Sequence, residues 1–336
     1  SLTVSTTSNL GASVTTSGLQ TYSQAVTLSA SNTLTSSANG NLLFSTTVNG
    51  DGVAARTLSL STGGDTEFVG AVGGTTGLGG LTITTATLDA AAIKVGGAIS
   101  ITNSGVGLID GVISDNGLTA ATLTKAGNGT LTLTATNTYT GATAISAGTG
   151  TLAIGTAGSL GTVSGGKATY SQTISIGAAA TLSYASSVDQ TLSGVIGTAN
   201  TAGVVTKSGT STLTLSADNI FTGGLTVNAG TVVLSGSLDS AINLANNTTF
   251  TVTADITHQD VISATTSDGD VNAGATINMP INLVNGQYLL WADGADQTTA
   301  QISNINAALT TGSDNILIDY VASDDGNDTR ITGTNQ

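Results

Sequence analysis

Apolar residues alternate with threonine or serine along most of this chain. Stretches such as "AVTLSA" (25–30), "RTLSLST" (56–62) and "TLTLTAT" (130–136) show the pattern at period two. Such alternation predicts short β-strands with one buried and one exposed face. Clusters of Gly, Asn, Asp and Ser separate these stretches, and nearly the whole chain lacks the helical spacing that βαβ units require. The pattern therefore predicts an all-β protein.

One phrase occurs twice, as "TKAGNGTLTLTATNTYTGATAISAGTGTLAIG" at 124–155 and "TKSGTSTLTLSADNIFTGGLTVNAGTVVLSG" at 206–236. When Lys125 is aligned with Lys207, segments upstream also fall into register, so the two copies occupy about 110–155 and 193–236 and recur after about 82 residues. Further matched pairs are Leu131/Leu213, Leu133/Leu215, Asn137/Asn219, Tyr139/Phe221 and Gly148/Gly230.

A shorter step of roughly twenty residues lies inside each copy, for example from Leu131 to Leu152. This step is typical of one solenoid coil. A coil of short strands buries only one side, so it must stack on its neighbours, with strands about 4.8 Å apart. We therefore expect a parallel β-helix over residues 1–285, with about fifteen coils and a length of about 70 Å. Inward Leu, Ile and Val would form ladders along its axis.

Stacked β-sandwich modules are the competing architecture. They predict copies of about 90 to 100 residues and a core rich in large aromatic side chains. Only 3% of this chain is Phe, Trp or Tyr. The 82-residue recurrence keeps the sandwich open, whereas the twenty-residue step favours the solenoid.

The chain changes character near its end, and residues 286–336 are predicted to form a cap over the last coil. A helical spacing of apolar residues at 302, 305, 308 and 309 predicts a short helix, and residues 316–333 read as a hairpin. The single tryptophan, Trp291, is expected in the core of this cap.

Charge limits the possible partners. Only 8% of the residues are charged and the net charge is −14. Proteins that bind phosphates need clustered Lys or Arg, so nucleic acid and anionic membranes are excluded as partners. The six basic residues stand singly along the chain: Arg56, Lys94, Lys125, Lys167, Lys207 and Arg330.

Other features fit a secreted protein. There is no cysteine, and no apolar run reaches the eighteen or so residues of a membrane helix. Ser1 follows no methionine or leader peptide, so we expect a processed or excised piece.

The first copy of the repeated phrase resembles the passenger-associated repeat of bacterial autotransporters, whose idealised form reads GxGxLTLxGxNTYTGxTxVxAGxLxLG. The second copy matches less fully, since Ser211 replaces a glycine and Phe221 the tyrosine. Residues 18–74 are similar to coils of filamentous-haemagglutinin-like surface proteins, and residues 315–334 resemble the segment before a translocating barrel. The resemblance implies a right-handed parallel β-helix on, or released from, a Gram-negative surface. In the first copy the matching residues are Gly127, Gly129, Leu131, Leu133, Asn137, Tyr139, Thr140, Gly141, Ile145, Gly148 and Leu152.

Candidate catalytic residues are sparse. His258 is the single histidine, no G-x-S-x-G elbow accompanies it, and we interpret it as a loop residue. The segment "GTVSGGKA" (161–168) nearly spells a phosphate-binding loop, but Ala168 lacks the required hydroxyl and strands rather than a helix follow, so we expect a glycine corner. Glu67 is the only glutamate, and no carboxylate pair suits glycoside hydrolysis.

Two acidic runs are candidate calcium ligands. They are Asp268 with Asp270, and Asp324 and Asp325 with Asp328. Neither has the helix-loop-helix calcium spacing, and turns between strands favour Asp in any case. We therefore expect no metal, cofactor or catalytic residue, and leave calcium as the open alternative.

The leading hypothesis is an extracellular structural surface protein or adhesin, not an enzyme, whose loops or sheet edges touch host or cell-surface ligands. The alternative is a subunit that assembles end to end with other copies, through strands such as "SLTVST" (1–6) and "TRITGT" (329–334). A polysaccharide-degrading β-helix enzyme is the minor alternative.

Overall fold

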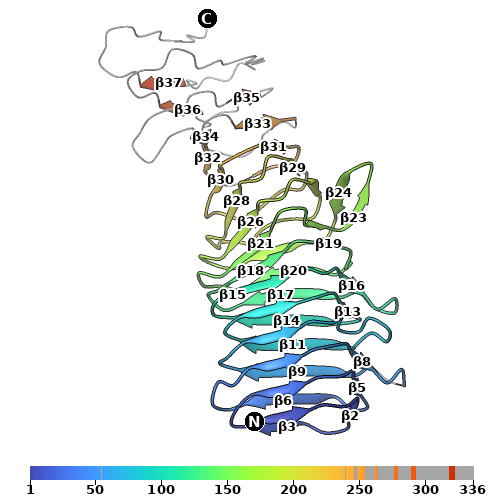
Figure 1. Cartoon of the computed structure of the whole chain (residues 1–336). Coiled ribbons are helices and arrows are strands. Elements are labelled where there is room, and N and C mark those ends of the chain that lie inside the picture. Colours follow the sequence, from blue (N-terminus) through green and yellow to red (C-terminus); the bar gives the residue numbers. More distant parts are fainter. Residues whose placement is uncertain are drawn as a thin grey trace, which may run out of the picture.

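The computed structural model describes residues 1–253, except 54, 239, 246 and 247, and four short strands beyond them at 262–263, 276–278, 289–292 and 318–321. The described residues contain strands and turns but no helix. They wind into a parallel β-solenoid of about 11 turns, which rises from its blue N-terminal end in Figure 1. The all-β solenoid is thus confirmed, and the stacked-sandwich alternative is excluded.

The longest sheet runs the whole length of the solenoid, and we call it sheet 1. It has fifteen parallel strands, whereas the solenoid has about 11 turns, fewer than the fifteen coils that the sequence predicted. In order they are β1 (Leu2–Val4), β4 (Gln20–Tyr22), β7 (Leu42–Phe44), β10 (Thr66–Phe68), β12 (Leu88–Ala90), β15 (Val106–Ile109), β18 (Thr130–Leu133), β21 (Thr151–Ile154), β26 (Thr181–Tyr184), β28 (Val204–Lys207), β30 (Leu225–Val227), β32 (Ile242–Leu244), β34 (Ile262–Ser263), β36 (Leu289–Ala292) and β37 (Ile318–Val321).

A second face of the solenoid, sheet 2, covers the N-terminal part. Its eight strands are β3 (Val14–Thr16), β6 (Asn32–Ser36), β9 (Thr57–Thr62), β11 (Gly80–Thr85), β14 (Ala98–Asn103), β17 (Thr122–Ala126), β20 (Thr143–Ile145) and β25 (Ile174–Ile176). Three short sheets complete the coils here: β2 (Ser8–Leu10) with β5 (Val26–Leu28) and β8 (Val48–Gly50); β13 (Ile93–Val95) with β16 (Ile113–Asp115); and β19 (Thr136–Asn137) with β22 (Ser159–Leu160).

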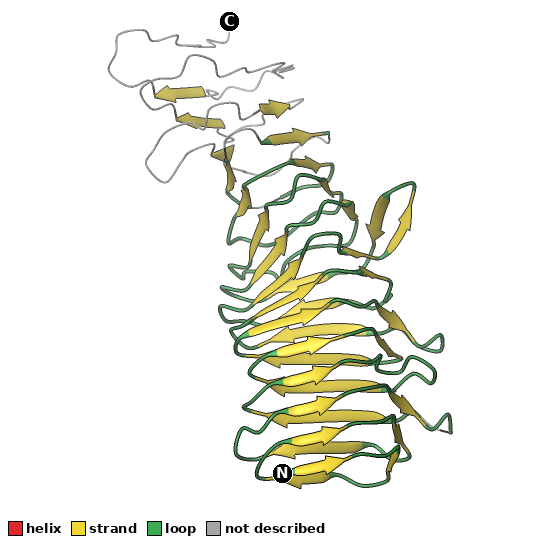
Figure 2. Cartoon of the chain, in the orientation of Figure 1, coloured by secondary structure: helices red, strands yellow, loops and turns green. Residues whose placement is uncertain are grey.

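Sheet 3 replaces these faces in the C-terminal part. It begins with a hairpin, in which β23 (Thr162–Ser164) runs antiparallel to β24 (Lys167–Tyr170), and this is the one antiparallel pair among the described strands. Figure 2 shows the hairpin projecting from the solenoid. The remaining strands are β27 (Asp189–Leu192), β29 (Thr212–Leu215), β31 (Thr231–Leu234), β33 (Thr249–Val252) and β35 (Thr276–Asn278).

Strand register confirms that the coil is the repeating unit. Thr130 pairs with Thr151, a step of 21 residues, and Thr151 pairs with Thr181, a step of 30 residues that contains the hairpin. Alternate residues point inward and form an aliphatic ladder along sheet 1, because parallel in-register strands place equivalent residues over one another. That ladder contains Leu131, Leu152, Leu182, Val205, Leu225 and Ile242, all at most 2% exposed.

A second inward ladder of sheet 1, two residues further along each strand, begins with aromatic residues. Tyr22, Phe44 and Phe68 are register partners on sheet 1. Their rings stack with centroids 5.0 and 4.7 Å apart and are nearly parallel. In these three coils, offset stacking of the rings adds to the burial of apolar surface.

The predicted cap at 286–336 is only partly described. Its strands β36 and β37 pair in parallel and continue sheet 1. The expected helix near 302–309 and the turn of the expected hairpin lie outside the described residues, and the boundary near residue 285 stays a prediction.

Candidate interaction surface

Loops are concentrated along one edge of the solenoid. The segments 51–56 and 116–121 each leave a short sheet and enter sheet 2, and the β23–β24 hairpin leaves β22 at the equivalent point. The segment 73–79 also enters sheet 2, after Val72, which forms isolated bridges with Val48 and Ile93. Figure 1 shows loops projecting beside β8, β13 and β16, on the side from which the hairpin projects. We call this row the loop edge. Loops displayed on a rigid scaffold are the usual place for binding residues.

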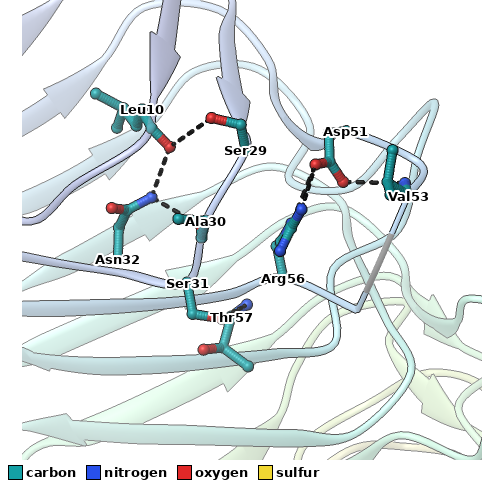
Figure 3. Close-up of polar contacts among 9 residues, drawn as sticks. All are labelled: Leu10, Ser29, Ala30, Ser31, Asn32, Asp51, Val53, Arg56 and Thr57. Atoms are coloured by element: carbon teal, nitrogen blue, oxygen red, sulfur yellow. Dashed lines mark hydrogen bonds and ion pairs between the residues drawn. The ribbon is translucent and has the colours of Figure 1, made fainter.

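Polar contacts hold the first loop in place, as Figure 3 shows. The Asp51 carboxylate accepts a hydrogen bond from the Val53 amide at 3.0 Å and pairs with the Arg56 guanidinium at 2.6 Å. The hydrogen bond that Arg56 donates to Asp51 is also the main reason that the pKa of Arg56 is raised. Ser31 anchors the following strand by accepting from the Thr57 amide at 3.1 Å. The loop therefore presents Val53 in a defined position.

The third loop is pinned in a similar way. The Asn116 side chain accepts a hydrogen bond from the Leu118 amide at 2.9 Å, and the Asp115 carboxylate accepts one from the Ala121 amide at 2.7 Å. The same carboxylate accepts from the Thr140 hydroxyl one coil above, at 2.7 Å. Two coils are thereby joined beneath an exposed leucine.

Aliphatic side chains stand out on this edge. Leu118 and Val53 are 86% and 82% exposed, the two highest values among the large apolar residues of the described chain, and Val163 on the hairpin is 46% exposed. Single exposed apolar residues are common on protein surfaces. Here they recur at the tips of pinned loops on one edge, which makes the loop edge the best candidate for contact with a partner.

The phosphate-loop resemblance at 161–168 is explained by the hairpin. Gly165 and Gly166 form its two-residue turn, with φ of 59° and 80°, and Ser164 pairs with Lys167 across it. A turn with positive φ at both positions requires glycine or asparagine and matches the twist of the two strands. Strands flank these glycines, so the segment lacks the helix N-terminus that cradles a phosphate.

The remaining predicted site residues are separated in space or lie outside the described chain. Glu67 points outward on sheet 1, beside Asp89 on the next strand. The side chain of Trp291 lies outside the described residues, as do His258 and the acidic runs at 268–270 and 324–328. Within the described residues, no group of three or more His, Cys, Asp or Glu could hold a metal ion, and no helix is long and apolar enough to cross a membrane.

Two of the six basic residues, which the sequence shows only as standing singly along the chain, are buried. Lys125 and Lys207 are each 0% exposed and point into the solenoid. Burial away from water lowers the pKa of each from 10.5 to about 8, and Asp189 partly opposes this shift for Lys207. The period-two alternation does predict that these lysines point inward, because each follows an inward residue, Leu123 or Val205, by two positions.

The segments that contain these lysines match a known protein family. The passenger-associated-transport-repeat family matches residues 123–154 and 205–234. The chain therefore carries two passenger-type repeats. The repeats and the β-solenoid together are consistent with an autotransporter passenger, as the sequence resemblance predicted, and they imply a secreted or surface-exposed protein. Passenger repeats are generally not enzymatic. Comparisons with curated proteins and with solved structures gave no significant match.

The two passenger repeats share one set of internal contacts. The Asn137 side-chain oxygen accepts from the Ile113 amide at 3.0 Å, while its nitrogen donates to two carbonyls, of Ala135 and of a residue one coil above. Asn219 does the same in the second repeat, accepting from the Ile196 amide at 3.1 Å. These asparagines satisfy buried backbone groups where the strands are too short for a full ladder.

Structure corrects the alignment of the repeats at their last glycine. Sequence matched Gly148 with Gly230, whereas the residue equivalent to Gly230 is Gly150. A Cβ atom on Gly150 would lie 3.2 Å from the Lys125 ammonium, and one on Gly230 would lie 2.8 Å from the Lys207 ammonium. The second repeat is therefore two residues shorter between its lysine and this glycine.

The passenger repeats also occupy different faces of the solenoid. In the first, the lysine strand β17 lies in sheet 2 and the next strand, β18, in sheet 1. In the second, the lysine strand β28 lies in sheet 1 and β29 in sheet 3. The second repeat is thus advanced by one face around the axis, so the 82-residue recurrence is not a whole number of coils.

Proposed function

We propose that this protein is an extracellular adhesive passenger, in which the solenoid serves as a stalk on the bacterial surface and the loop edge contacts another cell, a host or a solid surface. The observation that carries the proposal is the row of pinned loops whose tips expose Val53 and Leu118. Passenger repeats and the elongated fold support extracellular display.

Beads coated with the purified chain test the adhesive role. We would measure their retention on cultured epithelial cells and on polystyrene, for the wild type and for a variant with Val53→Ser and Leu118→Ser. We expect the wild type to be retained and the variant to fall to the level of uncoated beads. The matched control replaces Val69 and Val106 by serine, because these valines are 57% and 69% exposed but lie beside and in sheet 1, away from the loop edge. Equal loss in both variants, or no retention of the wild type, would overturn the proposal.

Self-assembly is the second candidate function, and the first coil favours it. Strands β1, β2 and β3 each stand at the end of their sheet, and the half-buried Leu2 and Val4 pack against the core. Sheet edges of this kind can pair with a strand from another chain. We propose that a second copy docks there, end to end.

Molar mass measured by light scattering across a wide concentration range tests this assembly. We expect the mass to rise with concentration for the wild type and for Thr3→Lys, which alters an exposed residue of β1, but not for Val4→Lys. A wild type that keeps the monomer mass at every concentration would refute end-to-end assembly.

A further inference from the structure

One inner corner of the solenoid is closed by a column of polar side chains. Ser36, Thr62, Thr85 and Asn103 occupy successive coils in register at the end of sheet 2 strands. The first three hydroxyls donate to the carbonyls of Gly18, Gly40 and Gly64, at 2.7 to 3.0 Å. Asn103 donates to the carbonyls of Gly105 and Thr130. The chain turns beside most of these carbonyls, and the polar side chains give them an additional donor inside the coil.

The column reaches a glycine in the first passenger repeat. Gly127 follows Asn103 in register, and it has no side chain to offer. Lys125, two residues earlier and also inward, supplies the donor instead. Its ammonium donates to the carbonyls of Ala126 and Gly127, at 2.6 and 2.9 Å.

The second repeat uses the same arrangement on another face. Ser186 is the buried polar residue of the preceding coil, and the next coil has Gly209 at that place, two residues after Lys207. The Lys207 ammonium donates to the carbonyl of Gly209 and, at 3.3 Å, to that of Ala229 one coil above. A lysine followed two residues later by a corner glycine is therefore a local device that works on either face.

We propose that the lysine of each passenger repeat is an internal clamp, whose terminal nitrogen donates to the corner carbonyls, and that the burial of its charge makes the stability of the solenoid depend on external pH. The lysine nitrogen has three donors as an ammonium and two as a neutral amine, so it can bond to two backbone carbonyls in either form. The adjoining glycine, Gly150 or Gly230, leaves room for it beneath the next coil.

Charged neighbours are few around the clamps. Lys125 lies between Ile101 and Ile145 in register, with no titratable side chain facing it from these strands. Lys207 lies between Tyr184 and Val227 in register, with its nitrogen 5.9 Å from the Tyr184 ring centre and with Asp189 near enough to favour its charge. The cost of removing each charged nitrogen from water is therefore offset mainly by carbonyl dipoles. For Lys207 the face of a tyrosine ring and one carboxylate also contribute.

The direction of the pH effect follows from linkage. The folded lysines have a pKa of about 8, below the unfolded value of 10.5, so each releases a proton on folding between these two pH values. Folding then becomes more favourable as the pH rises from about 8 toward 10, by up to about one proton per lysine. Below pH 8 both states carry the charge and the dependence disappears. Burial also raises the pKa of Tyr22, Tyr170 and Tyr184 to about 12, so the phenols oppose this trend only above pH 10.

Thermal melts of the whole chain from pH 6.5 to 9.5 test the clamp. We expect the melting temperature of the wild type to rise above pH 8, and the rise to be halved in Lys125→Met or Lys207→Met and lost in the double variant. Lys94→Met and Lys167→Met are the matched controls, because these lysines point outward, and they should keep the full rise. An unchanged rise in the double Met variant would overturn the proposal.

A second variant covers the case in which methionine prevents folding. Lys125→Arg stays charged throughout this pH range and should give a reduced slope. Adding a small amine to an alanine variant then distinguishes hydrogen bonding by the lysine nitrogen from simple packing by its side chain. Lys125→Ala should melt higher in propylammonium chloride than in sodium chloride, whereas Leu131→Ala, a buried position without the carbonyl cluster, should not. No difference between the two salts for Lys125→Ala would count against the clamp.

Discussion

Replacing Asn137 by alanine tests how the passenger repeat holds its coils together. The change removes three hydrogen bonds and leaves the buried amide of Ile113 and the carbonyls of Ala135 and Ser159 without their partner. A buried donor left unsatisfied costs about 1 to 3 kcal/mol, and a carbonyl with a second lone pair or access to water costs less. We expect a local loss of about 3 kcal/mol.

Hydrogen exchange suits this prediction better than a global unfolding curve, since repeat proteins open coil by coil rather than as one unit. A local loss of about 3 kcal/mol speeds exchange of the Ile113 amide by about a hundredfold. Asn219→Ala should do the same to the Ile196 amide, because the contacts are equivalent. Each variant is the control for the other, since the two sites are several coils apart. Exchange at Ile113 that stays within a few-fold of the wild type in Asn137→Ala would refute the reasoning.

Three further outcomes are expected. Phe44→Ala should destabilise the solenoid by about 3 to 5 kcal/mol in chemical denaturation, because it removes the middle ring of a buried stack, and a loss below about 1 kcal/mol would contradict that role. Gly166→Val should open the hairpin to limited proteolysis, since its φ of 80° strains a branched residue, whereas Gly165→Asn should leave cleavage unchanged. Arg56→Ala should leave the melting temperature unchanged, because its ion pair with Asp51 is near the surface, and a drop of several degrees would show that the pair matters.

Sequence alone determined the fold of this protein, because a strand that alternates Leu with Thr has one energetically acceptable orientation. The run from Thr130 to Leu133 buries its leucines and exposes its threonines whatever lies around it. The twenty-residue step between such runs then requires stacking, since no single coil can cover its own apolar face. The same alternation along each strand also predicts that Lys125 and Lys207 point inward, although charged side chains usually lie on the surface.

Tertiary structure decided which face each strand occupies and where the loops gather. The two passenger repeats are alike in sequence, yet the second lies one face further around the axis, because the 30-residue coil with its hairpin intervenes. No local pattern records that accumulated rotation. The same holds for the loop edge, where Val53 and Leu118 share one side only because the coil lengths between them bring their loops to the same corner. Alternation depends only on neighbouring residues. The position of a strand around the solenoid axis depends instead on the lengths of all the coils that lie between the two strands compared.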